Sequence, residues 1–361
     1  MHRNVSVVCS HCGSAYEVSL ERITCDCGGV LDLDFEPEGH EIEDVREFGL
    51  ARYAAQLPVG LEELRRASLG LATTPMLEMT DGVSVKCDYI SPSGSFKDRG
   101  AQVLVALALS LGAERVVLDS SGNAGAAMAA HCAHVGLACS VVVPVSAPAA
   151  KLSQSLAYGA TVVAIDGDRA AATAAAKTMV DRPGTFYASH VENPLFLEGT
   201  KTWAFEVVEQ IGDAPEEVVM SVGNGSLLLG AHRGFASLFS QGRTSKMPRM
   251  VAVQAKGWSP LSGDVAHGTS APLADGIAIL NPRRGEQIAR VIASTGGEVR
   301  VVGEGEIVEA TIGLARRGLW VEPTSGAAWA AASMASQGRP GPVVVSLGGA
   351  GFKSSPSPLR T

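Results

Sequence analysis

Short apolar runs alternate with longer helical patterns through most of this 361-residue chain. The runs are rich in Val and Ile and have the length of buried parallel strands. Six strands are expected, at residues 115–119, 138–143, 161–165, 217–221, 250–254 and 343–346. Helices are expected at 101–111, 148–158, 169–180, 304–316 and 325–335, with two more after glycine turns, one of them ending at 135. This alternation predicts an α/β fold with open, mostly parallel, doubly wound sheets covered by helices on both faces.

A loop of small residues at 91–100 carries a lysine where a buried helix is expected to begin. A strand-like alternation at 83–90 precedes the loop, and the apolar run at 101–111 follows it. The N-terminus of a helix has free N–H groups and positive potential, which disfavour a second positive charge. Lys97 is therefore a candidate nucleophile toward an aldehyde. The alternative is a surface lysine paired with Asp98 and Arg99.

Three of the predicted strands end in turns rich in glycine and hydroxyl groups. Residues 120–125 read Ser-Ser-Gly-Asn-Ala-Gly, residues 222–226 read Val-Gly-Asn-Gly-Ser, and residues 347–351 read Leu-Gly-Gly-Ala-Gly. A glycine turn that opens a helix presents N–H groups to an anion. The second turn lacks the third glycine and the acidic partner of a dinucleotide fingerprint, so it fits a single phosphate monoester better. Parallel strands bring such turns to one edge of a sheet, where ligands bind.

Four of the seven cysteines lie within the first 27 residues, as two closely spaced pairs. Two pairs on opposed turns, with a strand-like segment at 16–20 between them, are typical of a small ribbon that encloses Zn²⁺ with thiolates. The second pair is one residue tighter than usual, so a redox pair or a ribbon without metal are alternatives. The expected ligands of a structural zinc ion are Cys9, Cys12, Cys25 and Cys27. The other three cysteines are expected in the core.

Composition limits the classes of partner. The net charge is −8, and no cluster of Lys and Arg is long enough to follow a phosphate backbone, which argues against a nucleic-acid partner. Apolar stretches are interrupted well before membrane-spanning length, and the first residues lack the apolar core of a signal peptide.

The acidic stretch at 34–44 is interpreted as a linker, and helical patterns follow at 45–57 and 61–68. We expect a cytoplasmic enzyme with a small-molecule substrate.

A lysine able to form an imine, a turn suited to one phosphate and an Asn on a separate turn together suit pyridoxal 5′-phosphate. The chain also carries, in order, Gly49-Leu-Ala-Arg-Tyr53, Leu57-Pro58, Thr74-Pro75, Ser93-Gly-Ser-Phe-Lys-Asp-Arg99, Ser121-Gly-Asn-Ala124, Tyr158-Gly-Ala160, Asn193-Pro194, Glu198-Gly-Thr-Lys-Thr202 and Gly223-Asn-Gly225. In these motifs it resembles the threonine synthase branch of the pyridoxal-phosphate enzymes that share the tryptophan-synthase β-subunit fold. The cysteine ribbon is similar to that of many members.

The resemblance implies a role for each matched residue. Lys97 would hold the cofactor as an imine and then act as the base, Phe96 would pack near the ring, and Asn123 would bond the ring hydroxyl. Ser346 is the candidate partner of the pyridine nitrogen. Backbone N–H groups of Gly223, Asn224, Gly225, Ser226 and Leu227 would hold the phosphate, and Ser120, Ser121, Gly122 and Ala124 would receive the substrate carboxylate.

The resemblance also implies a domain division. We expect a zinc-ribbon-like segment at 1–35, a larger cofactor-binding domain of residues 36–88 and 186–361, and a smaller α/β domain at 89–185. The cofactor would lie between the two larger parts. A homodimer is expected on the same ground.

One position departs from the family pattern. Where the family has an arginine that grips the substrate's phosphate, this chain has Phe196. Either Lys151, Arg169 or His190 supplies the missing charge, or the substrate lacks that phosphate. The leading hypothesis is a threonine synthase, which eliminates phosphate from O-phosphohomoserine and adds water. The alternatives are threonine or serine dehydration, sulfite addition to phosphoserine as in cysteate synthase, and a scaffold without catalysis.

Overall fold

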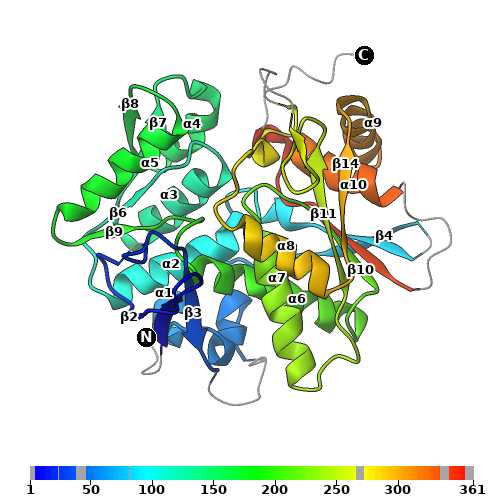
Figure 1. Cartoon of the computed structure of the whole chain (residues 1–361), viewed down its shortest axis with the longest axis horizontal. Coiled ribbons are helices and arrows are strands. Elements are labelled where there is room, and N and C mark those ends of the chain that lie inside the picture. Colours follow the sequence, from blue (N-terminus) through cyan, green and yellow to red (C-terminus); the bar gives the residue numbers. More distant parts are fainter. Residues whose placement is uncertain are drawn as a thin grey trace. The chain divides into compact units, whose positions relative to one another are not determined.

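The structure is a computed structural model, and it describes residues 5–22, 24–37, 46–80, 82–265, 272–333 and 341–353. The chain divides into two compact units (Figure 1). Unit 1 consists of Met1–Ala72 and Lys97–Thr200, and unit 2 of Thr73–Phe96 and Lys201–Thr361. The expected division into a segment at 1–35, a larger cofactor-binding domain of residues 36–88 and 186–361, and a smaller domain at 89–185 stays a prediction. None of the described helices has the length and hydropathy that a membrane span requires.

Unit 1 is built on a fully parallel four-stranded sheet. Its strands are β8 (Thr161–Ile165), β7 (Ala138–Pro144), β6 (Arg115–Leu118) and β9 (Thr185–Tyr187), in that spatial order. Helix α2 (Lys97–Ser110) precedes β6 in the chain, and α3 (Asn123–Val135), α4 (Ala149–Ala157) and α5 (Arg169–Thr178) lie between successive strands. Val142 packs in a cluster with Ala172 of α5, whereas the neighbouring Val141 side chain lies against Gly125 of α3. Successive strand residues point to opposite faces, so α3 and α5 cover opposite faces of this sheet.

The N-terminal part of unit 1 is a three-stranded antiparallel ribbon. Strand β1 (Val5–Cys9) lies between β2 (Ala15–Glu17) and β3 (Leu31–Phe35). A 3₁₀ helix, Gly49–Gln56, and a short helix α1 (Leu61–Arg66) follow. The helical pattern expected at 45–57 is therefore a 3₁₀ segment interrupted by the non-helical Tyr53. Most of the expected acidic linker, residues 38–44, lies outside the described residues.

Unit 2 contains a six-stranded sheet. Its spatial order is β14 (Glu298–Val302), β11 (Arg249–Ala255), β10 (Glu217–Ser221), β15 (Val343–Ser346), β5 (Val83–Lys86) and β4 (Met76–Thr80). All neighbours are parallel except the edge pair β4 and β5. Helices α9 (Glu304–Ala315) and α10 (Pro323–Ser333) share one apolar cluster with this sheet, and α7 (Ser226–Ser240) and α8 (Gly285–Ser294) also contact β11. The predicted α/β fold with mostly parallel sheets is confirmed.

A buried ion pair fixes the start of unit 2. Lys86 and Glu206 are both almost completely buried, and the Lys86 Nζ lies 2.6 Å from a Glu206 carboxylate oxygen. The same amine donates to the Thr74 carbonyl at 2.6 Å, while the Thr74 hydroxyl donates to Asp88 at 2.9 Å. A buried charge is tolerated only when its hydrogen-bonding capacity is satisfied, so this network holds residues 74–88 in one arrangement.

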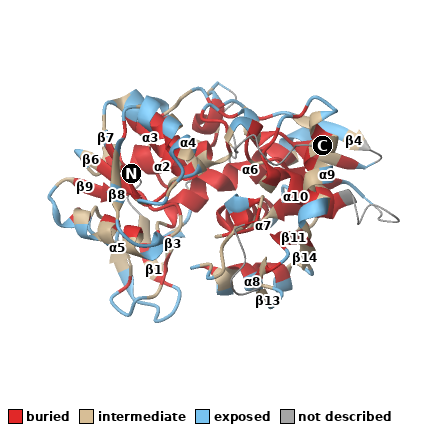
Figure 2. Ribbon diagram, turned by 90° about the horizontal axis from the view of Figure 1, so that it is seen from above, coloured by how far each residue is buried: buried red, intermediate tan, exposed pale blue. Residues whose placement is uncertain are grey.

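Helix α6 (Leu195–Ile211) approaches α2 unusually closely at its first turns. A Cβ on Gly199 would overlap the Arg99 carbonyl oxygen, and a Cβ on Gly100 would lie 2.5 Å from the Phe196 ring. Glycine at both positions removes the side chains that would separate the two helices. Helix α2 is buried from Asp98 to Ala108 as a result of this and its other contacts (Figure 2).

Replacing Gly199 with alanine is expected to destabilise unit 1. The new methyl group overlaps backbone, which cannot rotate away, so the cost is about 3 kcal/mol of unfolding free energy. Urea denaturation measures the loss. Gly313→Ala in α9 is the matched control, because a Cβ there meets nothing within 4 Å and a helical Gly→Ala change gains about 0.5–1 kcal/mol. Equal stability of the two variants would contradict the close crossing.

Candidate functional site

Lys97 is the first residue of α2 and lies beside a buried aromatic ring. Its Nζ is 5.5 Å from the centroid of the Phe196 ring, and Phe196 is 1% exposed. The neighbouring Asp98 and Arg99 are completely buried, and Asp98 Oδ1 lies 3.4 Å from Nε2 of His131 in α3. The two residues that follow Lys97 are thus part of the buried helix and do not form an exposed first turn. Lys97 is half-buried at the entrance of a buried helix, against an apolar surface.

His190 packs against the same aromatic ring. Its imidazole meets the Phe196 ring edge to face, with centroids 6.0 Å apart. Burial, and then the positive charges of Lys97 and Arg169, lower the pKa of His190 well below its ordinary value. The imidazole is therefore neutral at pH 7, so His190 does not supply the positive charge that the sequence left open.

Asp119, at the start of the turn after β6, is fixed by two hydrogen bonds. The Tyr187 hydroxyl donates to one Asp119 oxygen at 2.6 Å, and the Thr173 hydroxyl donates to the other at 2.5 Å. Burial, and then the charge of Asp119, raise the pKa of Tyr187. A Cβ on Gly125 would overlap the Ser120 carbonyl oxygen, so the chain turns tightly into α3. No side chain caps the start of this 13-residue helix, which leaves its first N–H groups available to an anion.

In unit 2, the turn after β10 opens α7 in the same way. Its cap residue Gly225 has a φ of 75°, which favours glycine, and no side chain caps the helix. A Cβ on Gly223 would lie 3.0 Å from the Gly276 carbonyl oxygen, so the loop also lacks room for a side chain there. The result is a backbone cradle at the N-terminus of a 15-residue helix.

Ser346 ends the strand next to this cradle. Strands β10 and β15 are parallel neighbours, so their carboxyl ends meet at one edge of the sheet of unit 2. The Ser346 hydroxyl is buried and has no hydrogen-bond partner among the described residues. The Phe96 backbone N–H donates to the Gly348 carbonyl at 2.9 Å, and a Cβ on Gly348 would lie 3.0 Å from the Phe96 ring. Phe96 therefore packs beside the strand end that carries the unpaired hydroxyl.

The predicted residues thus form two groups. Unit 1 holds Lys97 and the turn Ser120, Ser121, Gly122, Asn123 and Ala124. Unit 2 holds Phe96, Gly223, Asn224, Gly225, Ser226, Leu227 and Ser346. Sequence reasoning did not foresee the support that Asp119 gives to the turn, nor the neutral state of His190. The position of Asp119 at the end of an apolar strand was the sequence signal that could have indicated its support of the turn. No sequence signal indicates the neutral state of His190.

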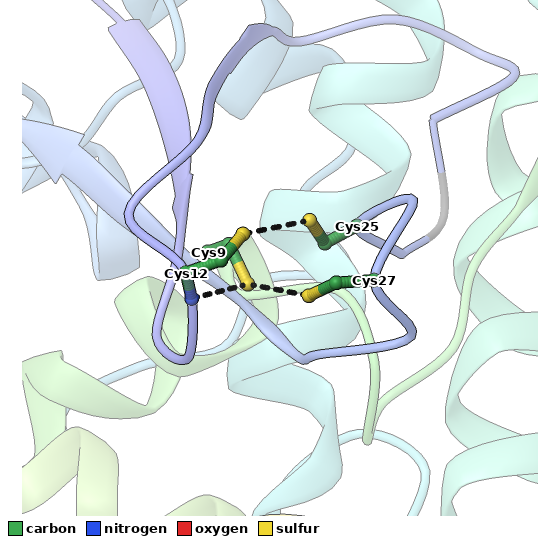
Figure 3. Close-up of side chains that lie close together, drawn as sticks. All are labelled: Cys9, Cys12, Cys25 and Cys27. Atoms are coloured by element: carbon green, nitrogen blue, oxygen red, sulfur yellow. Dashed lines mark hydrogen bonds between the residues drawn. The ribbon is translucent and has the colours of Figure 1, made fainter.

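The four N-terminal cysteines converge at one end of the ribbon (Figure 3). Cys9 and Cys27 sulfurs are 3.6 Å apart, Cys12 and Cys25 sulfurs are 3.4 Å apart, and all four lie within 4.8 Å of one another. A tetrahedral thiolate site with Zn–S bonds of about 2.3 Å needs this spacing. A hydrogen bond with Ser14 contributes most to lowering the pKa of Cys12 to about 6. The predicted four-cysteine set could therefore bind a metal ion.

Comparison with known proteins identifies the family. The family model described as "Pyridoxal-phosphate dependent enzyme" matches residues 67–349. The chain belongs to this family. A "Threonine synthase" of Methanocaldococcus jannaschii is 35% identical over 344 residues, which is 88% of this chain and 84% of that protein. A "Threonine synthase" of Mycobacterium tuberculosis is 31% identical over 326 residues, which is 86% of this chain and 90% of that protein. The chain is thus a threonine synthase-like pyridoxal-phosphate lyase.

Solved structures of this family share the fold. Maize serine racemase matches with a TM-score of 0.69 and 22% identity, over 80% of this chain and 92% of that one. A pyridoxal 5′-phosphate-dependent aspartate racemase matches with a TM-score of 0.67 and 25% identity, over 81% and 96%. The same architecture therefore serves more than one reaction, and the substrate must be argued from the site.

The features of each unit fit parts of pyridoxal phosphate. The glycine cradle before α7 suits one phosphate group, and the unpaired Ser346 hydroxyl suits a ring nitrogen in need of a partner. Lys97 supplies the amine that an aldehyde requires. When bound, the cofactor supplies an electron sink for charge that develops at the substrate Cα.

Replacing Ser346 with alanine is expected to lower the affinity for the cofactor without lowering the stability of the fold. The hydroxyl has no hydrogen-bond partner in the part of the chain that the structure describes, so its loss leaves the unfolding free energy of the cofactor-free protein within about 0.5 kcal/mol of wild type. Cofactor affinity falls about tenfold, for one lost hydrogen bond. Urea denaturation and titration with pyridoxal phosphate measure the two effects. In Ser325→Ala, the control, the buried Gly349 N–H loses its 3.2 Å bond and stability falls. Unchanged cofactor affinity in Ser346→Ala would refute the role of Ser346.

Protein purified without chelator is expected to contain about one zinc ion per chain. Cys12→Ser combined with Cys27→Ser removes half of the ligands, so the zinc content should fall below about a tenth of the wild-type value. Elemental analysis measures both, and Cys139→Ala outside the cluster is the control. A wild-type protein without zinc would show that the four cysteines have another role.

Proposed function

We propose that this lyase converts a homoserine-type amino acid, O-phosphohomoserine, to threonine and phosphate by elimination and addition of water. The observation that carries the proposal is the setting of Lys97, an amine at the start of a buried helix in a chain that matches threonine synthases over most of its length. The proposal gives the enzyme a small amino-acid substrate. We also expect it to act as a cytoplasmic homodimer.

The residues of unit 1 would handle the amino acid. Lys97 would bind the cofactor covalently, release it to the incoming substrate amine, and then take the proton from Cα. The substrate carboxylate would be held by the N–H groups of the turn from Ser120 to Ala124, which Asp119 keeps in place. Asn123 would meet the ring hydroxyl. Lys97 is thus the proposed base, and the turn orients Cα toward it.

The residues of unit 2 would hold the cofactor. Backbone N–H groups from Gly223 to Leu227 would bind its phosphate at the N-terminus of α7. The Ser346 hydroxyl would meet the pyridine nitrogen, which satisfies an otherwise unpaired buried group. Phe96 would pack near the ring. A hydroxyl partner leaves the ring nitrogen uncharged, in contrast to the effect of a carboxylate.

A second candidate function is favoured by Phe196. A fully buried phenyl ring and a neutral imidazole border Lys97 where the family pattern has a phosphate-binding arginine. A dianionic phosphate on the substrate finds no positive charge in these two groups, whereas an uncharged side chain needs none. The alternative is therefore an elimination or β-replacement on a substrate such as serine or threonine. Arg169, a candidate to bind a substrate phosphate, acts electrostatically on His190. Its guanidinium already donates to the Asp119 carbonyl at 3.2 Å.

Incubation of the cofactor-loaded enzyme with O-phosphohomoserine is expected to release inorganic phosphate and threonine in equal amounts. Both products are followed in the same samples, and Lys97→Ala, which lacks the base, is expected to form neither. Phosphate without threonine would show elimination without addition of water. Absence of both products, together with formation of pyruvate or 2-oxobutanoate from serine or threonine, would reject the first candidate in favour of the second.

A further inference from the structure

His190 is a buried polar side chain whose hydrogen-bonding capacity is unused. It is 8% exposed, and its one described contact is the edge-to-face packing against Phe196. The Nδ1 atom is buried without a partner among the described residues, and no described residue bonds Nε2. A buried polar group without a partner costs free energy, so such a group in a native protein points to a partner that binds later.

The segment around His190 is held in place by its neighbours. The Ser189 hydroxyl accepts the N–H groups of Val191 at 3.3 Å and Glu192 at 3.1 Å, which forms a tight turn. The Glu192 carboxylate pairs with Lys177 of α5 at 3.0 Å. The Asn193 side chain accepts the Leu195 N–H at 3.0 Å and begins α6. The backbone next to His190 is therefore held by these bonds, and the imidazole packs edge to face against a buried ring, which is how a binding group is preorganised.

Burial, and then the charges near His190, lower its pKa and favour the neutral imidazole. Lys97 and Arg169 both act on it, and both are positive. A neutral imidazole offers one N–H donor and one nitrogen acceptor, which suits an uncharged hydroxyl or carbonyl group as well as a phosphate oxygen. A substrate whose Cα proton is taken by Lys97 carries its side chain within a few bonds of that Cα, and Phe196 lies beside both Lys97 and His190.

We propose that His190 is a specificity-determining residue, which hydrogen-bonds the oxygen-bearing group on the substrate side chain while Phe196 forms the apolar wall beside it. The inference rests on the proposed function only in taking the substrate to be an amino acid bound at Lys97. It selects substrates with an oxygen substituent at Cβ or Cγ over those with a plain alkyl chain. A site that hydrogen-bonds a hydroxyl rejects the analogue without it more strongly than an apolar pocket can.

Two variants and two ligands test the inference. His190→Phe keeps an aromatic ring against Phe196 and removes both nitrogens, whereas His190→Gln keeps a donor and an acceptor. L-homoserine and L-2-aminobutyrate differ by one hydroxyl group. Each is titrated into the cofactor-loaded enzyme, and the dissociation constant is read from the change in the visible absorbance of the bound cofactor.

For His190→Phe, the dissociation constant of L-homoserine is expected to rise about tenfold or more, and that of L-2-aminobutyrate to stay within about twofold. His190→Gln is expected to recover at least part of the loss. Equal weakening of both ligands would show a structural role, and an unchanged homoserine constant would show that His190 does not meet the side chain. Either result overturns the inference. This test measures ligand binding and not turnover. It can therefore be interpreted even if the enzyme does not turn over O-phosphohomoserine, which is the result that would reject the proposed function.

Discussion

The close crossing of α2 and α6 determines most of the site in unit 1. Gly100 and Gly199 remove the side chains that would keep the helices apart, and the Phe196 ring occupies the space against Gly100. The Lys97 amine and the His190 imidazole both lie next to that ring. The amine, the apolar wall and the neutral imidazole are thus positioned by backbone packing rather than by flexible side chains. Such packing is what a site requires to hold reacting groups within a fraction of an ångström.

Buried polar networks hold the segments that sheet packing alone would leave loose. Asp119 joins the end of β6 to β9 and α5 through two hydroxyl groups, directly before the turn that is proposed to hold the substrate carboxylate. In unit 2 the Lys86–Glu206 pair does the same for residues 74–88. The glycine cradle before α7 needs no such network, because a helix N-terminus and glycines with little surrounding room already define it. The turn after β6 and the cradle before α7 therefore use different devices for rigid support.

Strands made of consecutive apolar residues were predictable from the sequence. Thr161–Ile165, Glu217–Ser221 and Val343–Ser346 have the bounds that their composition predicts. Glu298–Val302 was missed because a partly exposed edge strand with Glu and Arg lacks the continuous apolar run of a buried strand. Arg300 in this strand forms ion pairs with Glu217 and Glu298. Family motifs located Lys97 and the glycine turns. The neutral imidazole of His190 and the crossing at Gly199 depend on residues distant in sequence, so no local pattern predicts them.

Trapping the cofactor on its lysine tests the assignment of Lys97 most directly. Borohydride reduces the imine to a stable bond, and peptide mass mapping then locates the added mass. The peptide that contains Lys97 should carry it, and peptides with Lys86 and Lys201, which are buried, should not. Label on another lysine, or a bound cofactor that leaves no label after reduction, would contradict the role of Lys97 and the reaction proposed for it.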